Sequence, residues 1–420
     1  MDRLSTEGMH FRITGPSIAA RPSCLDWIAL LTSEPTTAWR TEWIADPAAL
    51  DAAFAGYVPA DIGLDTEFLR EKTYWPQLAL VQIALPDANP DGNDSVPASG
   101  RILLVDPLVP GMDAAIARML RDQRMRKLMH SAGEDLIALQ HTCGAVPEPL
   151  FDTQTAAALS GVGAGIGYQK LVHALLGENV DKGETRSDWV RRPLSPAQLR
   201  YAADDVRHLH RLQRDLSGRL SALNRLGWMD EDCARALKNA TEDVSDRWPH
   251  LTLRSAHFLD AASQVRLLRL LRWRETYARE HDRPRNWILD NELAYAIARK
   301  LPRDPAGLQS WLDAQPKSPR RLGATLWDVL TTPLADEGEM PLARGEDRDR
   351  GTYKQLQQVV ADHSAILGLP DGVLASRRWL EALQDGEDWP GALAGWRRTQ
   401  LEPLLTPLLS ASARPQTGGG

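Results

Sequence analysis

Two acidic residues stand two positions apart in an otherwise apolar, strand-like segment. The segment "GLDTEFLREKTYWPQLALVQIA", residues 63–84, contains Asp65 and Glu67. On a β-strand these side chains face the same side, about 6.6 Å apart at a rise of about 3.3 Å per residue. Two unit charges at that range repel by roughly 2.5 kcal/mol at an effective dielectric constant of about 20. A divalent cation would turn this repulsion into attraction, so the pair predicts a metal site.

A third candidate ligand lies in "HSAGEDLIAL", residues 130–139. Ser131 followed three residues later by Glu134 matches a capping box, in which the glutamate side chain helps to start the helix. Asp135 then falls in the first helical turn and is free to point elsewhere. We therefore expect Asp135 to join the acidic pair.

The fourth carboxylate comes from "SPAQLRYAADDVRHL", residues 195–209. Ser195 and Gln198 form a second capping box, with a proline at the first helical position. Tyr201 and Asp205 are four residues apart on this helix and share one face. Asp204 is rotated by about 100° from Asp205 and is expected to be solvated or to support the helix.

Four carboxylates supply an all-oxygen donor set, which suits Mg²⁺ or Mn²⁺ better than zinc. Two such ions about 3.5–4 Å apart can activate a water molecule and stabilise both oxygens of a phosphodiester displacement. The pattern therefore predicts hydrolysis of a phosphodiester.

The elements that must position these residues fall into two classes. Three neighbouring strand patterns at 61–68, 78–85 and 101–106 predict an antiparallel meander. Helices and short strands then alternate, which predicts a mixed sheet with helices on its faces; the helices are expected at 112–122, from 133, at 168–177 and at 196–214, and the strands at 126–130 and 150–153. Beyond about residue 215 the pattern is helical, with amphipathic segments at 254–281, 287–300, 306–313, 320–331 and 352–368.

The three acidic motifs occur in a fixed order as "LDTEFLREKTYWPQLALVQIA", "KLMHSAGEDLIAL" and "YAADDVRHL". With "PLFDTQTAAAL", "GYQKLV" and "DKGETRSDW" they resemble the ribonuclease D family, in the tyrosine subclass of the DEDD exonuclease superfamily, over about residues 38–409. The resemblance implies an RNase H-like exonuclease core with a mixed sheet. It also implies a metal centre for two Mg²⁺ or Mn²⁺ ions and a tyrosine that orients or deprotonates the attacking water. The implied ligands are Asp65, Glu67, Asp135 and Asp205, and the tyrosine is Tyr201.

By the same resemblance the substrate is RNA with a free 3′ end, notably transfer-RNA precursors, and the products are nucleoside 5′-monophosphates. Lys182 and Arg186 in "DKGETRSDW" are candidate phosphate contacts. Gln77, which follows a proline at the entry to the second strand, is a candidate contact for the terminal nucleotide.

The family also carries two helical HRDC modules, so the expected fold class is α/β plus all-α. The expected domains are an N-terminal extension, the exonuclease domain, a first HRDC domain, a linker, a second HRDC domain and a disordered tail, at residues 1–36, 37–245, 246–335, 336–350, 351–410 and 411–420. Seven arginines fall between Arg266 and Arg285, a local basic charge compatible with phosphate binding. Arginine interleaved with leucine is, however, usually the solvated face of a helix. Trp273 and Trp287 are expected in the core.

The bulk composition bounds these hypotheses. The 420 residues carry a net charge of −7, which argues mildly against a protein coated with phosphate-binding groups. Three scattered cysteines support neither a disulfide framework nor a zinc site. No apolar run is long enough to span a membrane and no leader is recognisable, so we expect a cytoplasmic protein, and a monomer suffices. Two alternatives stay open: a DNA 3′–5′ exonuclease on the same core, and a nucleic-acid-binding scaffold with a vestigial nuclease site.

Overall fold

The computed structural model describes residues 39–88, 97, 99–181, 183–184, 186–242, 246–343 and 349–412. The strands are β1 (Trp39–Ile44), β2 (Asp61–Leu69), β3 (Gln77–Pro86), β4 (Gly100–Val105), β5 (Arg126–Met129) and β6 (Leu150–Asp152). The helices up to residue 241 are α2 (Pro47–Ala55), α3 (Met112–Leu120), α4 (Gly133–Cys143), α5 (Thr153–Leu159), α6 (Tyr168–Leu176), α7 (Pro196–Arg207), α8 (Leu209–Ala222) and α9 (Leu226–Thr241).

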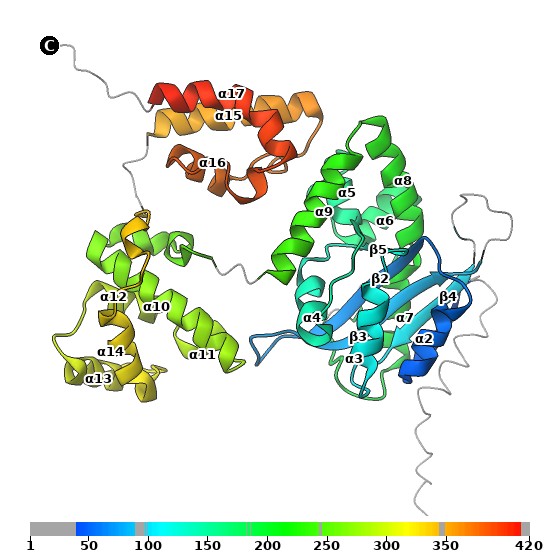
Figure 1. The fold of residues 1–420 in the computed structure, drawn as a ribbon, viewed down its shortest axis with the longest axis horizontal. Helices are drawn as coiled ribbons and strands as arrows, with labels where there is room; N and C mark the ends of the chain where they lie inside the picture. Colours follow the sequence, from blue (N-terminus) through cyan, green and yellow to red (C-terminus); the bar gives the residue numbers. More distant parts are fainter. Residues whose placement is uncertain are drawn as a thin grey trace, which may run out of the picture.

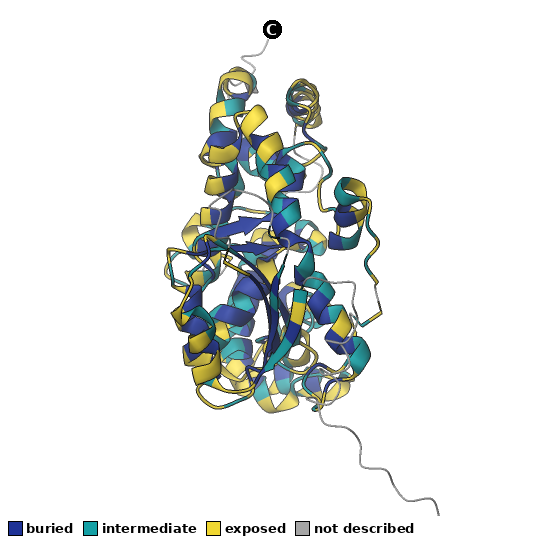
Figure 2. Cartoon of the chain, turned by 90° about the vertical axis from the view of Figure 1, so that its right-hand side faces the viewer, coloured by how far each residue is buried: buried dark blue, intermediate teal, exposed yellow. Residues whose placement is uncertain are grey.

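The six strands form one mixed sheet in the order β1-β4-β3-β2-β5-β6. β2, β3 and β4 pair antiparallel, as the predicted meander requires. β1 is parallel to β4, β5 is parallel to β2, and β6 is parallel to β5. The apolar run of β3 is buried almost throughout, because it lies in the middle of the sheet. Figure 2 shows the buried strands of the sheet between helices.

Helices cover both faces of this sheet (Figure 1). A Cβ atom on Gly63 of β2 would lie 3.2 Å from the carbonyl oxygen of Val206 in α7, so the C-terminal end of α7 packs directly on that face. α3 and α4 lie on the other face. β2 is therefore enclosed between two helical layers, which is where a buried polar site can be shielded from water.

Two helical modules follow the sheet. The first contains η1 (Pro249–Thr252), η2 (Arg254–Phe258), α10 (Ala261–Glu280), α11 (Arg285–Ile288), α12 (Asn291–Arg299), α13 (Pro305–Ala314), η3 (Arg320–Leu322), α14 (Gly323–Thr331) and η4 (Glu337–Glu339). It has a hydrophobic core of its own, formed by buried residues between Ala256 and Leu330. The second contains α15 (Arg350–Leu367), α16 (Arg377–Gln384), η5 (Gly391–Leu393) and α17 (Trp396–Ser412).

The second module shares its core with the nuclease region. The indole rings of Trp228 in α9 and Trp396 in α17 stack, with their centroids 4.1 Å apart and an angle of 6° between their planes. Beside them, Arg397 donates two hydrogen bonds to the buried carboxylate of Asp232, at 2.6 and 2.9 Å. α9 is thus the surface on which the C-terminal helices dock.

Several sequence expectations need correction. The helix expected at 196–214 is two helices separated at His208, whose backbone N–H donates to the hydroxyl of Tyr168 at 3.2 Å. The sequence patterns also missed β1, α2, α5 and α9. Trp287 was expected in the core but is 59% exposed, because α11 is only one turn long and lies at the surface. Trp273 does pack against the core of the first module.

The acidic segment expected as a linker lies against the first module as far as residue 343. His250 contacts the carbonyl oxygen of Pro341 at 2.9 Å, and the N–H of Ala343 donates to Gln264 at 2.7 Å. Residues 344–348 and the extension expected at 1–36 lie outside the described residues, and α17 runs two residues into the expected tail. Within the described ranges, no helix combines the length and the apolar character needed to cross a bilayer.

Candidate active site

β2 places Asp65 and Glu67 on one face, opposite Gln82 and Leu80 of β3. Gly63, two residues before Asp65, shares that face, so it is the face covered by α7. The pairing register shifts directly after Glu67, which marks a bulge there. Bulges redirect a strand and the side chains at its end. The predicted common orientation of the two carboxylates is therefore confirmed, and Glu67 stands where the strand bends.

The predicted capping box at the start of α4 is wrong. Ser131 has a φ of 60°, and no side chain caps the first turn. The N–H groups of Ser131 and Ala132 instead donate to the carboxylate of Asp152, at 3.1 and 2.9 Å. Glu134 forms an ion pair with Arg70 of the β2–β3 hairpin. Asp152, at the end of the neighbouring strand β6, thus accepts the backbone hydrogen bonds at the start of α4, a role that the sequence assigned to Glu134.

Asp135 is buried in the first turn of α4. The Thr66 hydroxyl donates to its carboxylate at 2.5 Å. Thr66 lies between Asp65 and Glu67 and points to the opposite side of β2. This contact fixes α4 against the strand that carries the acidic pair.

The predicted capping box of α7 is confirmed. Gln198 N–H donates to the Ser195 hydroxyl at 3.1 Å, and Ser195 N–H donates to the Gln198 side chain at 2.9 Å. One turn on, Tyr201 hydrogen-bonds Asp205. Asp204 points away and pairs with an arginine of its own helix at 2.9 Å. Asp205 therefore pairs with Tyr201 while the adjacent Asp204 points elsewhere, as the sequence of α7 predicts.

Burial and neighbouring charges raise the pKa values of all four carboxylates. Burial, and then the charges of the other three carboxylates, raise the pKa of Asp65 well above its ordinary value. Burial, followed by Asp205 and Asp135, raises the pKa of Glu67 to about 9. Burial also raises the pKa of Asp135 and of Asp205 to about 7, although hydrogen bonds from Thr66 and Tyr201 oppose it. One strand and two helices thus bring four acids into a single electrostatic cluster.

No set of three or more His, Cys, Asp or Glu side chains in the described part of the chain is already arranged to hold a metal ion. Asp135 and Asp205 are each held by a neighbouring hydroxyl group, and like charges favour separation when no cation lies between them. The donors themselves are carboxylate oxygens, which Mg²⁺ and Mn²⁺ prefer. The donor chemistry fits such ions, and binding them requires the side chains to turn toward one another.

A cavity of about 160 Å³ adjoins the cluster. It is lined by Leu64, Asp65, His130, Tyr168, Gln169, Tyr201, Asp205 and Leu209. The cavity is large enough for metal ions and several water molecules.

Sequence reasoning missed several residues of this environment. Tyr168 lines the cavity and is tied to α7 by donating to the Asp204 carbonyl oxygen at 2.9 Å. Trp189 is buried and packs against Tyr201, with ring centroids 6.0 Å apart. Both come from quoted motifs, but only the fold shows what they contact. His130 also lines the cavity, and its Nδ1 atom lies 2.9 Å from the Thr153 hydroxyl.

Of the three candidate substrate contacts, Gln77 and Arg186 are not part of the cavity lining. Gln77 is exposed at the start of β3, opposite Leu69. Arg186 is exposed in the loop before α7. Lys182 lies outside the described residues. All three remain predictions.

Comparisons with known proteins agree with this architecture. The sequence model of the 3′–5′ exonuclease family matches residues 41–221, and that of the HRDC domain matches residues 263–330. Ribonuclease D of Xanthomonas oryzae pv. oryzae is 53% identical over 371 residues, which cover 88% of this chain and 99% of that protein. Ribonuclease D of Pseudomonas paraeruginosa is 33% identical over 387 residues, covering 89% and 99%.

A solved structure is similar over the nuclease and helical regions together. The crystal structure of Escherichia coli RNase D, described as an exoribonuclease involved in structured RNA processing, matches with a TM-score of 0.73 and 28% sequence identity. The match covers 89% of this chain and 100% of that chain.

Proposed function

Because the chain belongs to the ribonuclease D family and is a 3′–5′ exoribonuclease, we propose that its hydrolytic centre is the cluster of four carboxylates together with Tyr201. The observation that carries this proposal is electrostatic. Burial raises the pKa values of all four acids, and the charges of Asp135 in α4 and Asp205 in α7 further raise those of Asp65 and Glu67 in β2. Burying several acidic groups together destabilises the folded state, so replacing them would stabilise a protein in which they had no function.

The proposed ligands of divalent metal are Asp65, Glu67, Asp135 and Asp205, and the proposed number of ions is two, Mg²⁺ or Mn²⁺. Bound there, the ions would lower the pKa of a water molecule and stabilise the charge that develops on the phosphate oxygens. Binding would also displace the protons that the raised pKa values retain in the acids.

Tyr201 and Asp205 act as a pair in this proposal. The Tyr201 hydroxyl is held by Asp205 on the same helix face and borders the cavity. From that position it can accept a hydrogen bond from the attacking water and aim it at the phosphorus. The bond from phosphorus to the 3′ oxygen of the preceding nucleotide breaks. A nucleoside 5′-monophosphate leaves, and the shortened RNA keeps a 3′ hydroxyl group.

The proposed substrates are RNA molecules with free 3′ ends, and transfer-RNA precursors are the class that the family resemblance favours. The similarity to the E. coli enzyme, a protein involved in structured RNA processing, supports an RNA of this kind. We further propose that the protein acts in the cytoplasm and as a monomer. Gln77, Lys182 and Arg186 are the proposed contacts for the RNA strand.

The test is product analysis of an RNA with a 3′ hydroxyl group, incubated with Mg²⁺. We expect nucleoside 5′-monophosphates to be released one at a time by the wild type and not by Asp205→Ala at unchanged thermal stability. A matched DNA strand, run in parallel, tests the preference for RNA. Full turnover by Asp205→Ala would refute the site assignment, and equal cleavage of the DNA strand would favour a general 3′–5′ exonuclease.

A further inference from the structure

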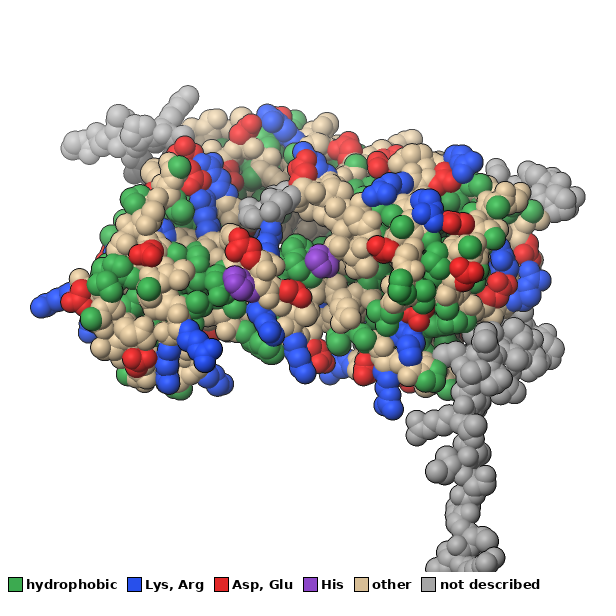
Figure 3. Space-filling view, turned by 60° about the horizontal axis from the view of Figure 1, so that its bottom comes forward, with side chains coloured by type: hydrophobic (Ala, Val, Ile, Leu, Met, Phe, Trp, Pro, Cys, Tyr) green, Lys and Arg blue, Asp and Glu red, His purple; other side chains and the backbone are tan. Residues whose placement is uncertain are grey.

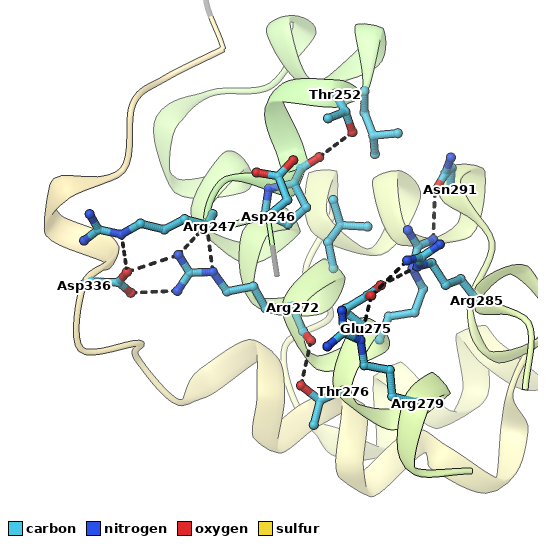
Figure 4. Close-up of a pocket in the computed structure, with 14 residues that line it drawn as sticks. Asp246, Arg247, Thr252, Arg272, Glu275, Thr276, Arg279, Arg285, Asn291 and Asp336 are labelled. Carbon is cyan, nitrogen blue, oxygen red and sulfur yellow. Dashed lines mark hydrogen bonds and ion pairs between the residues drawn. The ribbon is translucent and has the colours of Figure 1, made fainter. Parts of the chain in front are cut away.

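The arginines of α10 are engaged inside the protein. Arg269 pairs with Glu337 at 2.6 Å, and Arg272 pairs with Asp336 at 2.7 Å. One or two turns further along α10, a second set of contacts surrounds Glu275. Figure 4 shows Arg272 with Asp336 on one side of a pocket, and Glu275 with Arg279 and Arg285 on the other. Figure 3 shows Lys and Arg side chains interspersed with Asp and Glu over the face it presents. These arginines therefore hold parts of the protein together.

The second group of contacts holds the tip of the β2–β3 hairpin. The Tyr74 hydroxyl donates to Glu275 at 2.5 Å and accepts hydrogen bonds from Arg279 and Arg285, each at 3.0 Å. Asp282 accepts the N–H groups of both Tyr74 and Trp75, at 2.9 and 3.0 Å. We call this set of residues the hairpin clasp. It joins a residue of the nuclease region to residues more than 200 positions later in the chain.

The clasp is connected to the two segments that carry the acidic cluster. On one side, the hairpin turn follows the end of β2 at Leu69, two residues beyond Glu67 and the bulge. On the other, Arg70 of the hairpin donates to the carbonyl oxygen of Tyr74 at 3.2 Å and forms an ion pair with Glu134. Glu134 immediately precedes Asp135. A shift of the hairpin tip would therefore move β2 and the start of α4 relative to each other.

The charge on Glu275 strengthens the hydrogen bonds of the hairpin clasp. Burial by itself would raise the pKa of Glu275, but hydrogen bonds from Arg285 and Tyr74 lower it to about 2. Its carboxylate is thus ionised over the whole range in which enzymes are assayed. Hydrogen bonds to charged groups are stronger than those between neutral groups.

We propose that the first helical module is a positioning element of the active site: through Tyr74 and Asp282 it holds the β2–β3 hairpin, and so aligns Glu67 with Asp135. The inference rests on the proposed function of these carboxylates. Tyr74 and Asp282 are positioning residues and do not touch the substrate. This role is separate from any contact between the module and RNA.

A substrate of one nucleotide separates these two roles. The lining of the cavity beside the acidic cluster includes no described residue of the first module, so the module is not expected to contact a one-nucleotide substrate such as the p-nitrophenyl ester of a nucleoside 5′-monophosphate. Its hydrolysis reports only on alignment of the site. Release of p-nitrophenol from this ester and shortening of a long RNA are measured on the full-length protein with Mg²⁺.

We expect Tyr74→Phe to lower kcat on the small ester about tenfold with KM changed less than twofold, because misplacing catalytic groups by about 1 Å can cost about 100-fold. Asp282→Asn weakens the hydrogen bonds to the N–H groups of Tyr74 and Trp75 with little change of shape, and should also lower kcat on the ester. The control is Arg272→Gln on the same helix, which removes contacts to Asp336 and to the Arg247 carbonyl oxygen but none within the hairpin clasp, and should leave kcat on the ester unchanged.

A double variant tests whether the residues act as one unit. Tyr74→Phe combined with Glu275→Gln should lose no more activity than the more impaired single variant, since the two changes break one shared contact. If Tyr74→Phe and Asp282→Asn both keep kcat on the ester within twofold of the wild type, the inference is overturned, even where long RNA is bound more weakly. If the wild type shortens no RNA at all, it is the proposed function that fails.

Discussion

Glu67 should control how the stability of the metal-free protein depends on pH. Its pKa is about 9 in the folded protein, against an ordinary value of 4.5 in an unfolded chain. The folded state therefore holds a proton on Glu67 at neutral pH that the unfolded state does not. The contribution of Glu67 to stability is full below pH 4.5 and is lost as the pH rises toward 9.

The size of the effect follows from the two values. Keeping Glu67 protonated costs about 1.4 kcal/mol for each pH unit above 4.5, or about 3 kcal/mol at pH 7. Glu67→Gln removes the titrating group and keeps its shape. We expect the free energy of unfolding of metal-free Glu67→Gln at pH 7 to exceed that of the wild type by up to about 3 kcal/mol. Its decline between pH 5 and 9 should be correspondingly shallower.

Urea denaturation at a series of pH values, in the presence of a chelator, measures this difference. Repeating the series with Mg²⁺ supplies the matching control. Ions present at 100 times their dissociation constant stabilise a protein by about 2.7 kcal/mol, and the wild type should gain more than Glu67→Gln. Equal pH slopes for the two proteins without metal would refute the electrostatic account of the cluster.

Three further variants test other parts of the structure. Tyr201→Phe removes the hydrogen bond that lowers the pKa of Asp205, so we expect that pKa to rise and kcat to fall by about 10²–10⁴, measured as RNA shortening against pH. Asp232→Ala leaves Arg397 buried without its partner and should lower the free energy of unfolding by about 3–5 kcal/mol in urea denaturation. Asp152→Ala leaves four backbone N–H groups without an acceptor and should cost at least about 2 kcal/mol, observed as a lower Tm.

Local patterns predicted the parts of the site that are determined locally. The two-residue period of β2 places Asp65 and Glu67 on one face, and the four-residue spacing on α7 pairs Tyr201 with Asp205. The start of α4 was predicted wrongly because its structure depends on a residue that is distant in the sequence. Its N–H groups are satisfied by Asp152, about 20 positions away on another strand, and no local pattern reports such a partner.

The helical modules also contain contacts between residues distant in sequence, which local patterns cannot predict. The amphipathic period located most of their helices, but the arginines of α10 resembled a phosphate-binding surface. Their partners, Tyr74 on one side and Asp336 on the other, are distant in sequence, so the internal role of the arginines is visible only in the fold. Trp287 was misplaced because composition favours burial of tryptophan, whereas the single turn of α11 leaves it at the surface.

The central claim is that the four carboxylates hold paired divalent ions, and an anomalous difference map from crystals grown with Mn²⁺ tests it most directly. We expect two peaks about 3.5–4 Å apart between β2, α4 and α7, each about 2.2 Å from carboxylate oxygens of the cluster. Tyr201 should lie beside one of them. The absence of any peak at the cluster in crystals that bind Mn²⁺ elsewhere, or peaks coordinated by other residues, would contradict the account.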